Sequence, residues 1–432
     1  MSTFTFLHAA DIHLDSPLQR LGQYDEAIAE RLRSATRVAL ANLVDLAISE
    51  KVDLVIIAGD VYDGDWDDTR TGLFMVQQMR RLKDAAIPVF AIAGNHDAAT
   101  KMTYNVPLPE NVVMFGHKTA ETHRLEALDV AIHGRSFATQ AVTENLASSY
   151  PLAVPNVFNI GILHTSLDGR EGHALYSPCT VMDLQQKGYD YWALGHVHTR
   201  EIVCQNPWIV FPGNIQGRHI RETNERGAML VTVDRGPTTA PVIQAVFHPL
   251  DDARWVILEI DASQITSPDG LLDLIRSRFQ DLKNQHEPRA TVVRVVVSGA
   301  SAFSDVWHGN ERKLTADVLA VAQSISADIV LDKIRVRTTQ VRLAGDVAND
   351  DEPLSAIDDV IRRYLDEKSL AAELAADLAD VVGKKLPVEL TAGAEALAID
   401  SLEFVKDVLA DAGPFLRQRL AGHPSNQDKA KP

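Results

Sequence analysis

Short apolar runs alternate with longer amphipathic stretches in the first half of the chain. Apolar runs within 4–13, 52–60, 87–97, 157–166 and 190–198 have the length of buried strands. Between the first three runs, apolar residues recur at helical intervals within 25–50 and 69–86, as at Ile28, Leu32, Ala35, Ala39, Leu43 and Leu46. This β-α-β-α-β order predicts an α/β sheet. The stretches 202–214 and 226–236 are predicted as antiparallel strands joined by turns.

The pattern changes beyond a boundary that we expect between Arg235 and Asp252, where prolines and glycines gather. Strands predicted at 254–260, 291–299 and 327–339, with a helix at 268–282 and a second helix after 299, form a small α+β domain over 250–342. Strand signals end there. A helical region is expected over 350–422, with stretches at 353–382 and 401–420, the latter broken at Gly413-Pro414. Residues 423–432 are expected to be a disordered tail.

Polar residues follow five of the predicted strands. They are Asp11 and His13, Asp60, Asn95 and His96, His164, and His196 and His198. Functional groups gather at the carboxyl ends of strands in open α/β sheets, so we expect these side chains to lie together. Imidazole and carboxylate are the ligands of Mn²⁺, Fe²⁺ and Zn²⁺. So many ligands suit two cations about 3.5–4 Å apart that share a carboxylate, and Asp60, at an abrupt strand end, is the residue we expect to be shared.

Glycines precede three of these positions, at residues 59, 94 and 195. A glycine at a strand end allows the backbone to turn sharply and to approach a neighbour closely. The sequence therefore predicts a tightly packed rim around the candidate ligands.

The composition restricts the classes of protein that remain. The chain has 432 residues, which suggests two or three domains, and it has ordinary apolar and charged fractions. With only two cysteines and no leader-like N-terminus, we expect a cytoplasmic protein without a disulfide framework. No apolar run reaches the length of a membrane span. The net charge of −17 is unusual for a protein that binds nucleic acid unaided.

The strand-end residues belong to short motifs that resemble those of a known superfamily. "DIH", "GDVYD", "GNHD", a lone histidine after a strand, and "GHVH" occur in the order typical of calcineurin-like metallophosphoesterases. "HGRSF" and "FPGNIQGRHIRET" are similar to segments of the SbcD-type DNA repair exonuclease subunits, in particular the YhaO-like branch. The resemblance implies a four-layer αββα sandwich over residues 1–245, a small α+β capping domain, and C-terminal helices.

The resemblance also implies roles for individual residues. One metal would be held by Asp11, His13, Asp60 and His198, and a second by Asp60, Asn95, His164 and His196. Two Mn²⁺ ions are the expected cofactors, with Fe²⁺ or Zn²⁺ as alternatives. His96 would be the general acid that protonates the leaving oxygen, with Asp63 holding it. Some exonuclease relatives carry histidine at the Asp63 position, which is where this chain departs from them.

Other polar residues allow both a structural and a functional interpretation. His8, His133 and Cys179 are predicted to be packed structural residues, whereas His173 either borders the site or lies on a solvated loop. Arg218, His219 and Arg221 either contact phosphate or lie in a surface turn. Lys333, Arg335 and Arg337 alternate with apolar residues, so in a strand they share one face, about 6.6 Å apart. That face is either a strip for a nucleic-acid backbone or an ordinary solvated surface.

Two classes of function follow. The first is a DNA exo/endonuclease subunit that works with an SbcC-like ABC-type ATPase carrying a coiled coil, with a homodimer as a further assembly. The extra domain and the C-terminal helices favour it, since apolar helices either dock such a partner or pack on their own domain. The alternative is a phosphoesterase for a small molecule or a phosphoprotein, which the net charge and Asp63 favour. The first class is our prediction.

Overall fold

A computed structural model of the chain describes residues 2–16, 26–63, 69–99, 107–169, 176–236, 240–341 and 353–383, together with scattered positions between 385 and 416. Internal contacts divide the chain into two compact units. The first contains residues 1–256 and 286–291, and the second contains residues 257–285 and 292–432. The first unit therefore extends beyond the limit at residue 245 that the sequence suggested.

The first unit contains a six-stranded mixed sheet in the order β12-β11-β1-β2-β3-β4. Its strands are β1 (Ser2–Ala9), β2 (Leu54–Ala58), β3 (Val89–Ile92), β4 (Val112–Met114), β11 (Gly227–Arg235) and β12 (Val242–Pro249). The strands β1 to β4 are parallel, whereas β11 runs antiparallel to both β1 and β12. The parallel arrangement follows from the helices α1 (Glu26–Ser49) and α2 (Arg70–Asp84), which return the chain between successive strands.

A second six-stranded sheet has the order β5-β6-β7-β8-β10-β9. Its strands are β5 (Glu121–Leu125), β6 (Val130–Gly134), β7 (Phe158–His164), β8 (Tyr191–Gly195), β9 (Glu201–Gln205) and β10 (Trp208–Phe211). The expected antiparallel pairing within 202–214 is confirmed by β9 and β10. A short 3₁₀ helix, η3 (Leu146–Ser149), and the helix α4 (Val181–Gln185) belong to the same part of the chain.

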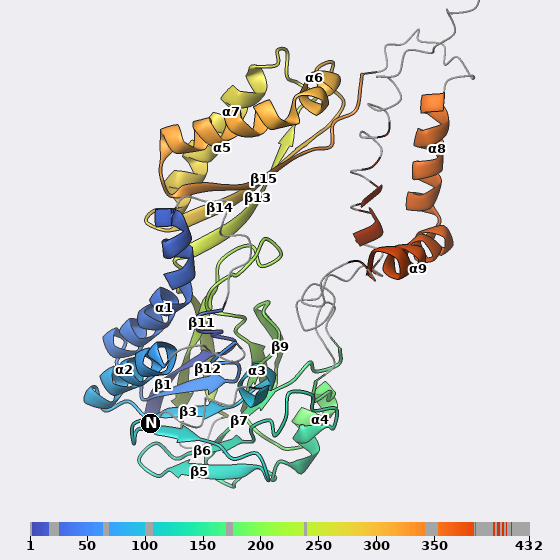
Figure 1. Cartoon of the computed structure of the whole chain (residues 1–432). Helices are drawn as coiled ribbons and strands as arrows, with labels where there is room; N and C mark the ends of the chain where they lie inside the picture. Colours follow the sequence, from blue (N-terminus) through green and yellow to red (C-terminus); the bar gives the residue numbers. More distant parts are fainter. Residues whose placement is uncertain are drawn as a thin grey trace, which may run out of the picture. The chain divides into compact units, whose positions relative to one another are not determined.

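The layers of this unit can be followed in Figure 1, and apolar cores among the described residues hold them together. One lies between α1, α2 and the first sheet, and includes Leu43 and Met79. The middle core joins the two sheets through residues such as Phe6 and Tyr191. The third packs η3 and α4 on the second sheet around Trp192. The unit is therefore a four-layer αββα sandwich, as the motif resemblance implied.

Some strands lie where the sequence predicted none. β12 lies within the segment that we interpreted as a domain boundary, and it pairs along its length with β11. The strands β4, β5 and β6 also went unpredicted. Both β5 and β12 are edge strands with alternating exposed and half-buried positions. Edge strands bury little apolar surface, so their sequences resemble loops.

The second unit contains most of a three-stranded sheet, β13-β14-β15, with strands β13 (Ala253–Asp261), β14 (Ala290–Ser298) and β15 (Ile329–Val336); the first residues of β13 and β14 belong to the first unit. Its helices are α5 (Gly270–His286), α6 (Ser304–Gly309) and α7 (Glu311–Ile325), followed by α8 (Pro353–Asp366) and α9 (Lys368–Gly383). Of the expected second helical stretch at 401–420, only scattered residues are described, and the expected tail at 423–432 lies outside the described residues. Among the helices that are described, none combines the length and apolarity needed to cross a membrane.

Candidate metal centre

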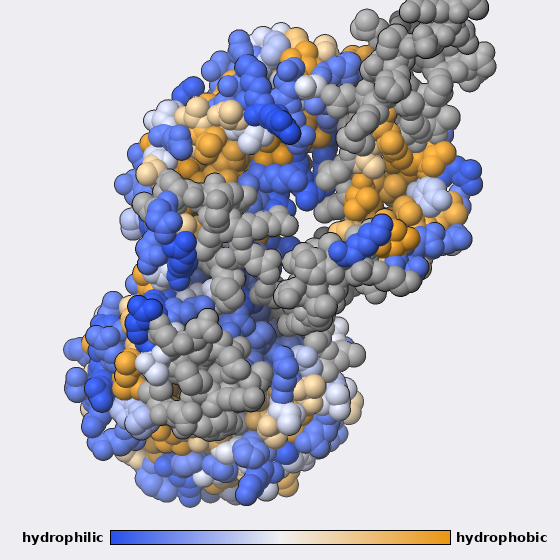
Figure 2. All heavy atoms as spheres, viewed as in Figure 1, coloured by the Kyte–Doolittle hydropathy of each residue, from blue (hydrophilic) through white to orange (hydrophobic). Residues whose placement is uncertain are grey.

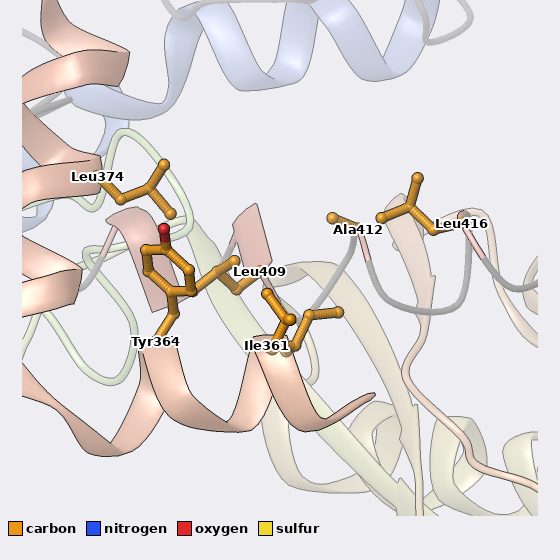
Figure 3. A pocket seen from close by; sticks show the side chains of 7 residues that line it. Ile361, Tyr364, Leu374, Leu409, Ala412 and Leu416 are labelled. Atoms are coloured by element: carbon orange, nitrogen blue, oxygen red, sulfur yellow. The ribbon is translucent and has the colours of Figure 1, made fainter. Parts of the chain in front are cut away.

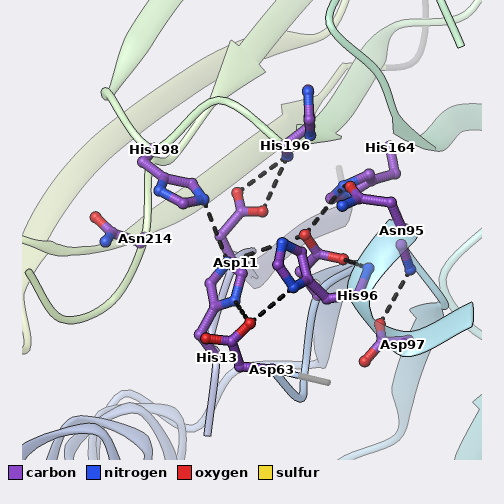
Figure 4. A network of polar contacts seen from close by, with 12 residues as sticks. Asp11, His13, Asp63, Asn95, His96, Asp97, His164, His196, His198 and Asn214 are labelled. Carbon is purple, nitrogen blue, oxygen red and sulfur yellow. Dashed lines mark hydrogen bonds and ion pairs between the residues drawn. The ribbon is translucent and has the colours of Figure 1, made fainter. Parts of the chain in front are cut away.

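The residues that follow the strands come together at one rim of the two large sheets (Figure 4). In the first sheet these residues follow the ends of β1, β2 and β3, and in the second sheet they lie at the ends of β7 and β8. In chain order, they are Asp11 and His13, Asp60, Asn95 and His96 at the start of α3 (Asn95–Ala99), His164, and His196 and His198. Asp11, His13, Asp60, Asn95, His164 and His196 are all buried. The predicted convergence of these side chains is therefore what the structure shows.

Glycines allow the two sheets to approach each other at this rim, as the sequence predicted. A Cβ atom added at Gly195 would lie 2.0 Å from the carbonyl oxygen of Ala58, and one at Gly59 would lie 2.5 Å from His164 Nδ1. Gly59 also has a φ of +95°, which side-chain-bearing residues rarely adopt. The ends of β2 and β8 could not lie this close with any larger residue at these positions.

The backbone is strained at the candidate ligands themselves. Asp11, His13, Asp60 and His196 all have positive φ, between 46° and 96°. For residues other than glycine this conformation is costly and concentrates at functional sites. The surrounding fold holds these four side chains in directions that a relaxed strand end would not give.

The nitrogen and oxygen atoms of these side chains form three overlapping groups, in each of which all atoms lie within 4.8 Å of one another. The groups are Asp11, His13 and His198; Asp60, His164 and His196; and His13, Asp60 and His96. Asp60 lies between the first two groups, because its Oδ2 is 3.9 Å from His13 Nε2 and 3.4 Å from His164 Nε2. Asn95 joins the second group, with its Oδ1 2.9 Å from His164 Nε2.

The electrostatics of the group formed by Asp11, His13 and His198 fit a bound cation. Burial lowers the pKa of His13 and of His198 to about 4, so both are neutral imidazoles near pH 7, the form that ligates metals. Burial raises the pKa of Asp11 to about 7, and the charge of Asp60 adds to this effect. His13 Nε2 and His198 Nε2 lie only 3.2 Å apart, so both ring nitrogens face the same small space. A cation between such groups would satisfy the carboxylates and both ring nitrogens.

His96 and Asp63 form a close pair at the edge of the centre. His96 Nδ1 lies 2.7 Å from Asp63 Oδ1. Burial opposes protonation of His96, but the contact with Asp63 and the charge of Asp60 raise its pKa to about 9. Burial likewise opposes ionisation of Asp63, but His13, His96 and Arg218 hold the pKa of that carboxyl well below its usual range. The pair is therefore an imidazolium held by a carboxylate.

The segment after β10 contributes two residues whose position the sequence did not reveal. Arg218 is not in a surface turn. Its side chain is 4% exposed, and its Nη1 donates to Asp63 Oδ2 over 3.1 Å. Glu222 is also buried, and its Oε1 lies 2.7 Å from His198 Nδ1. His219 is half-buried and Arg221 is exposed. From sequence alone, a charged residue in a turn is expected at the surface. Nothing in the segment "GRHIRET" distinguishes the buried Arg218 and Glu222 from the exposed Arg221.

The remaining polar residues can now be placed. His8 is buried, with Nδ1 3.1 Å from the hydroxyl of Tyr191 and Nε2 3.2 Å from the carbonyl oxygen of Leu194, and His133 and Cys179 are buried as well, so the structural prediction is confirmed for all three. His173 lies outside the described residues. Lys333, Arg335 and Arg337 alternate with buried residues in and just after β15, so they share one face as predicted.

Comparison with known proteins identifies the class. The profile of the calcineurin-like phosphoesterase family matches residues 4–200, and that of the metallophosphoesterase YhaO middle domain matches residues 255–339. An uncharacterized metallophosphoesterase YhaO of Bacillus subtilis is 34% identical over 305 residues, which cover 70% of this chain and 73% of that protein. The chain therefore belongs to the calcineurin-like metallophosphoesterase family, and it is a metal-dependent hydrolase with the middle domain found in YhaO.

More distant relatives carry the name of a DNA repair protein. The DNA double-strand break repair protein Mre11 of Sulfurisphaera tokodaii is 29% identical over 321 residues, covering 71% of this chain and 76% of that protein. The protein of the same name from Methanopyrus kandleri is 23% identical over 435 residues, covering 94% of this chain and 86% of that protein. The similarity to Mre11 thus extends beyond the phosphoesterase domain.

Proposed function

We propose that the protein is a two-metal phosphodiesterase that cleaves DNA. The observation that carries the first part is the placement of Asp60 between two ligand groups, with the His96–Asp63 pair beside them. Asp11, His13, Asp60 and His198 would hold one cation, and Asp60, Asn95, His164 and His196 the other. When bound, such cations supply the activation of water and the neutralisation of phosphoryl charge. Mn²⁺ is the metal we infer, because the ligands mix imidazole with carboxylate and amide oxygens.

The chain's own side chains account for the proton that the leaving group needs. In our proposal, His96 is the general acid. Its Nδ1 is engaged by Asp63 at 2.7 Å, so Nε2 is the nitrogen that we assign to the leaving oxygen. Asp63 fixes the ring and favours its protonated form. His96 is itself close to His13 and Asp60, but its pairing with Asp63 favours the role of an acid over that of a ligand.

Two observations support DNA as the substrate: the names of the relatives, and a cationic face in the second unit. Two relatives named for double-strand break repair share about a quarter of their residues with this chain over most of its length. The second unit offers the cationic face of Lys333, Arg335 and Arg337. Phosphate contacts from such a face would offset the net charge of −17.

A second candidate is a phosphoesterase for a small molecule or a phosphoprotein. Asp63 favours it, since a carboxylate partner for the acid histidine is typical of the phosphatase branch that the chain also resembles. The acidic net charge points the same way. Neither feature requires the second unit, which is why DNA remains the better supported substrate.

We also infer that the C-terminal helices dock an ABC-type ATPase with a coiled coil. Apolar side chains gather over α8 and α9 (Figure 2). An apolar pocket of about 420 Å³ lies among these helices and the residues after them (Figure 3). It is lined by Val360, Ile361, Tyr364, Leu374, Leu409, Ala412 and Leu416. An apolar groove of this kind suits an amphipathic partner helix.

The test of the proposed activity is hydrolysis by the purified full-length chain, supplied with Mn²⁺, on three substrates. These are linear double-stranded DNA, hairpin DNA and an aryl phosphodiester. Our proposal predicts cleavage of all three, and loss of all cleavage on chelation. Cleavage of the aryl ester without cleavage of either DNA would favour the second candidate. No hydrolysis of any of the three would contradict the proposed activity.

A further inference from the structure

The turn after β10 places two oppositely charged side chains beside the candidate metal centre, against His198 and Asp63. The side chains of Arg218 and Glu222 are only 4% and 7% exposed, and Arg218 Nη2 lies 3.6 Å from Glu222 Oε1. The turn is closed by a hydrogen bond from the amide of Glu222 to the carbonyl oxygen of His219, over 2.8 Å. Burying two charges is costly unless each is well compensated, so the contacts of each side chain indicate its purpose.

Glu222 is aimed at His198. Its Oε1 lies 2.7 Å from His198 Nδ1, while its Oε2 accepts hydrogen bonds from Asn214 Nδ2 at 2.9 Å and from the amide of Arg218 at 2.8 Å. Both carboxylate oxygens are therefore held in place. With Nδ1 taken up by Glu222, the Nε2 side of His198 is turned toward the group formed with Asp11 and His13.

Arg218 is aimed at Asp63. Its Nη1 lies 3.1 Å from Asp63 Oδ2 and 3.3 Å from Ser16 Oγ, and Ser16 Oγ itself donates to the same Asp63 oxygen over 2.5 Å. These contacts occupy Oδ2, while the other oxygen, Oδ1, lies 2.7 Å from His96 Nδ1. The guanidinium therefore fixes the orientation of the carboxylate that holds His96.

A direct contact between Arg218 and substrate phosphate is the competing explanation. To make it, the guanidinium would have to leave two carboxylates while remaining almost fully buried. Breaking a buried pair by removing one partner leaves an uncompensated charge. The exposed cation of this turn, Arg221, is better placed for such a contact.

We propose that Arg218 and Glu222 form a positioning pair that aligns the two halves of the site. Glu222 orients His198 for the metal, and Arg218 orients Asp63, and through it His96, for proton donation. A carboxylate behind a ligand histidine sets its tautomer and ring direction. The role of Arg218 rests on the proposed function, whereas that of Glu222 requires only that the site binds metal.

Titration calorimetry of the metal-free full-length protein with MnCl₂ tests Glu222. Replacing it in Glu222→Gln should weaken one of the two binding steps by about 10–100-fold and leave the other unchanged. The control is Glu225→Gln, three residues along, whose carboxylate pairs with Arg254 outside the site. Unaltered binding in Glu222→Gln, or equal weakening of both steps, would overturn the proposal. Should Glu222→Gln fail to fold, Glu222→Asp must weaken the same single step.

Hydrolysis kinetics test Arg218. At saturating Mn²⁺, we expect Arg218→Gln to lose more kcat on an alkyl phosphodiester than on an aryl one, because the aryl group leaves without a proton. The control is Arg235→Gln, whose side chain pairs with Asp129 outside the site. A rise in KM at unchanged kcat would identify Arg218 as a phosphate contact and overturn its positioning role. A wild-type protein that binds two Mn²⁺ ions but hydrolyses no ester would refute the proposed function and with it the role of Arg218, while the calorimetry would still decide that of Glu222.

Discussion

The close approach of the two sheets makes Gly195 sensitive to even a small substitution. In Gly195→Ala, the added Cβ would lie 2.0 Å from the carbonyl oxygen of Ala58 and 3.0 Å from His164 Nδ1. Since the ordinary contact distance is above 3 Å, the ends of β2 and β8 must separate by ~1 Å. Overpacking of this kind costs roughly 1–3 kcal/mol of stability.

The same displacement should damage the metal centre. The carbonyl of Ala58 holds His164 Nδ1 at 3.0 Å, and Asp60 follows Ala58 by two residues. Moving this strand end therefore shifts His164 and Asp60, which we propose as ligands of the second cation. A misplacement of ~1 Å at a reacting centre can lower the rate about 10²-fold, so we expect Gly195→Ala to lose activity well beyond its loss of stability.

The variant Gly188→Ala is a control that distinguishes the cost of backbone strain from damage to the metal centre. Gly188, unlike Gly195, has a positive φ, of +74°, and a Cβ there would meet only Ala153 Cβ at 3.6 Å. Gly188→Ala should therefore cost about 1–2 kcal/mol through its backbone conformation alone and keep its activity. Urea unfolding and aryl phosphodiester hydrolysis at saturating Mn²⁺ measure the two effects. Wild-type activity in Gly195→Ala, or equal losses of activity in both variants, would refute the reasoning.

Three further predictions concern the acid, the core and the C-terminal helices. His96→Asn should slow cleavage of DNA by about 10²–10⁴-fold and of an aryl ester much less; equal losses in the two assays would exclude the acid role. Burial lowers the pKa of His8 from 6.5 to about 3, so the stability due to its neutral form is present above pH 6.5 and is lost as the pH falls from 6.5 toward 3. Urea unfolding of the metal-free protein should therefore depend less on pH in His8→Gln than in the wild type, by up to ~1.4 kcal/mol per pH unit, and parallel curves would contradict this assignment. Val360→Asp, in the pocket lining, should abolish pull-down of the coiled-coil ATPase, whereas Val381→Asp, equally exposed on α9 but outside the lining, should not; retained binding by Val360→Asp would argue against docking there.

The candidate ligands were predictable because their signal is local. Each follows a strongly apolar strand, and the glycines before Asp60, Asn95 and His196 indicate a tight turn. The carboxyl ends of parallel strands lie at the same edge of a sheet, so the five strand-end motifs together predict a single site. The αββα layers followed from the same strands through the family resemblance.

The features that the sequence did not reveal depend on partners far along the chain. Arg218 is buried because Asp63, 155 residues earlier, accepts its charge. Glu222 is buried because it meets His198 and Asn214. Hydrophobic periodicity indicates which segments are apolar, but it does not predict which charged side chains form buried ion pairs with residues far along the chain. The edge strands β5 and β12 were missed for a related reason, since their partly exposed residues are held by pairing with a neighbour.

The number of cations bound at saturation tests the central claim most directly. Metal-free protein titrated with Mn²⁺, with free and bound ions counted by electron paramagnetic resonance, should take up two ions per chain. Asp60→Asn should weaken both binding steps, because one carboxylate oxygen lies between His13 and His164. Saturation at a single ion, or an Asp60→Asn variant in which only one step is weakened, would contradict a centre built around a shared Asp60.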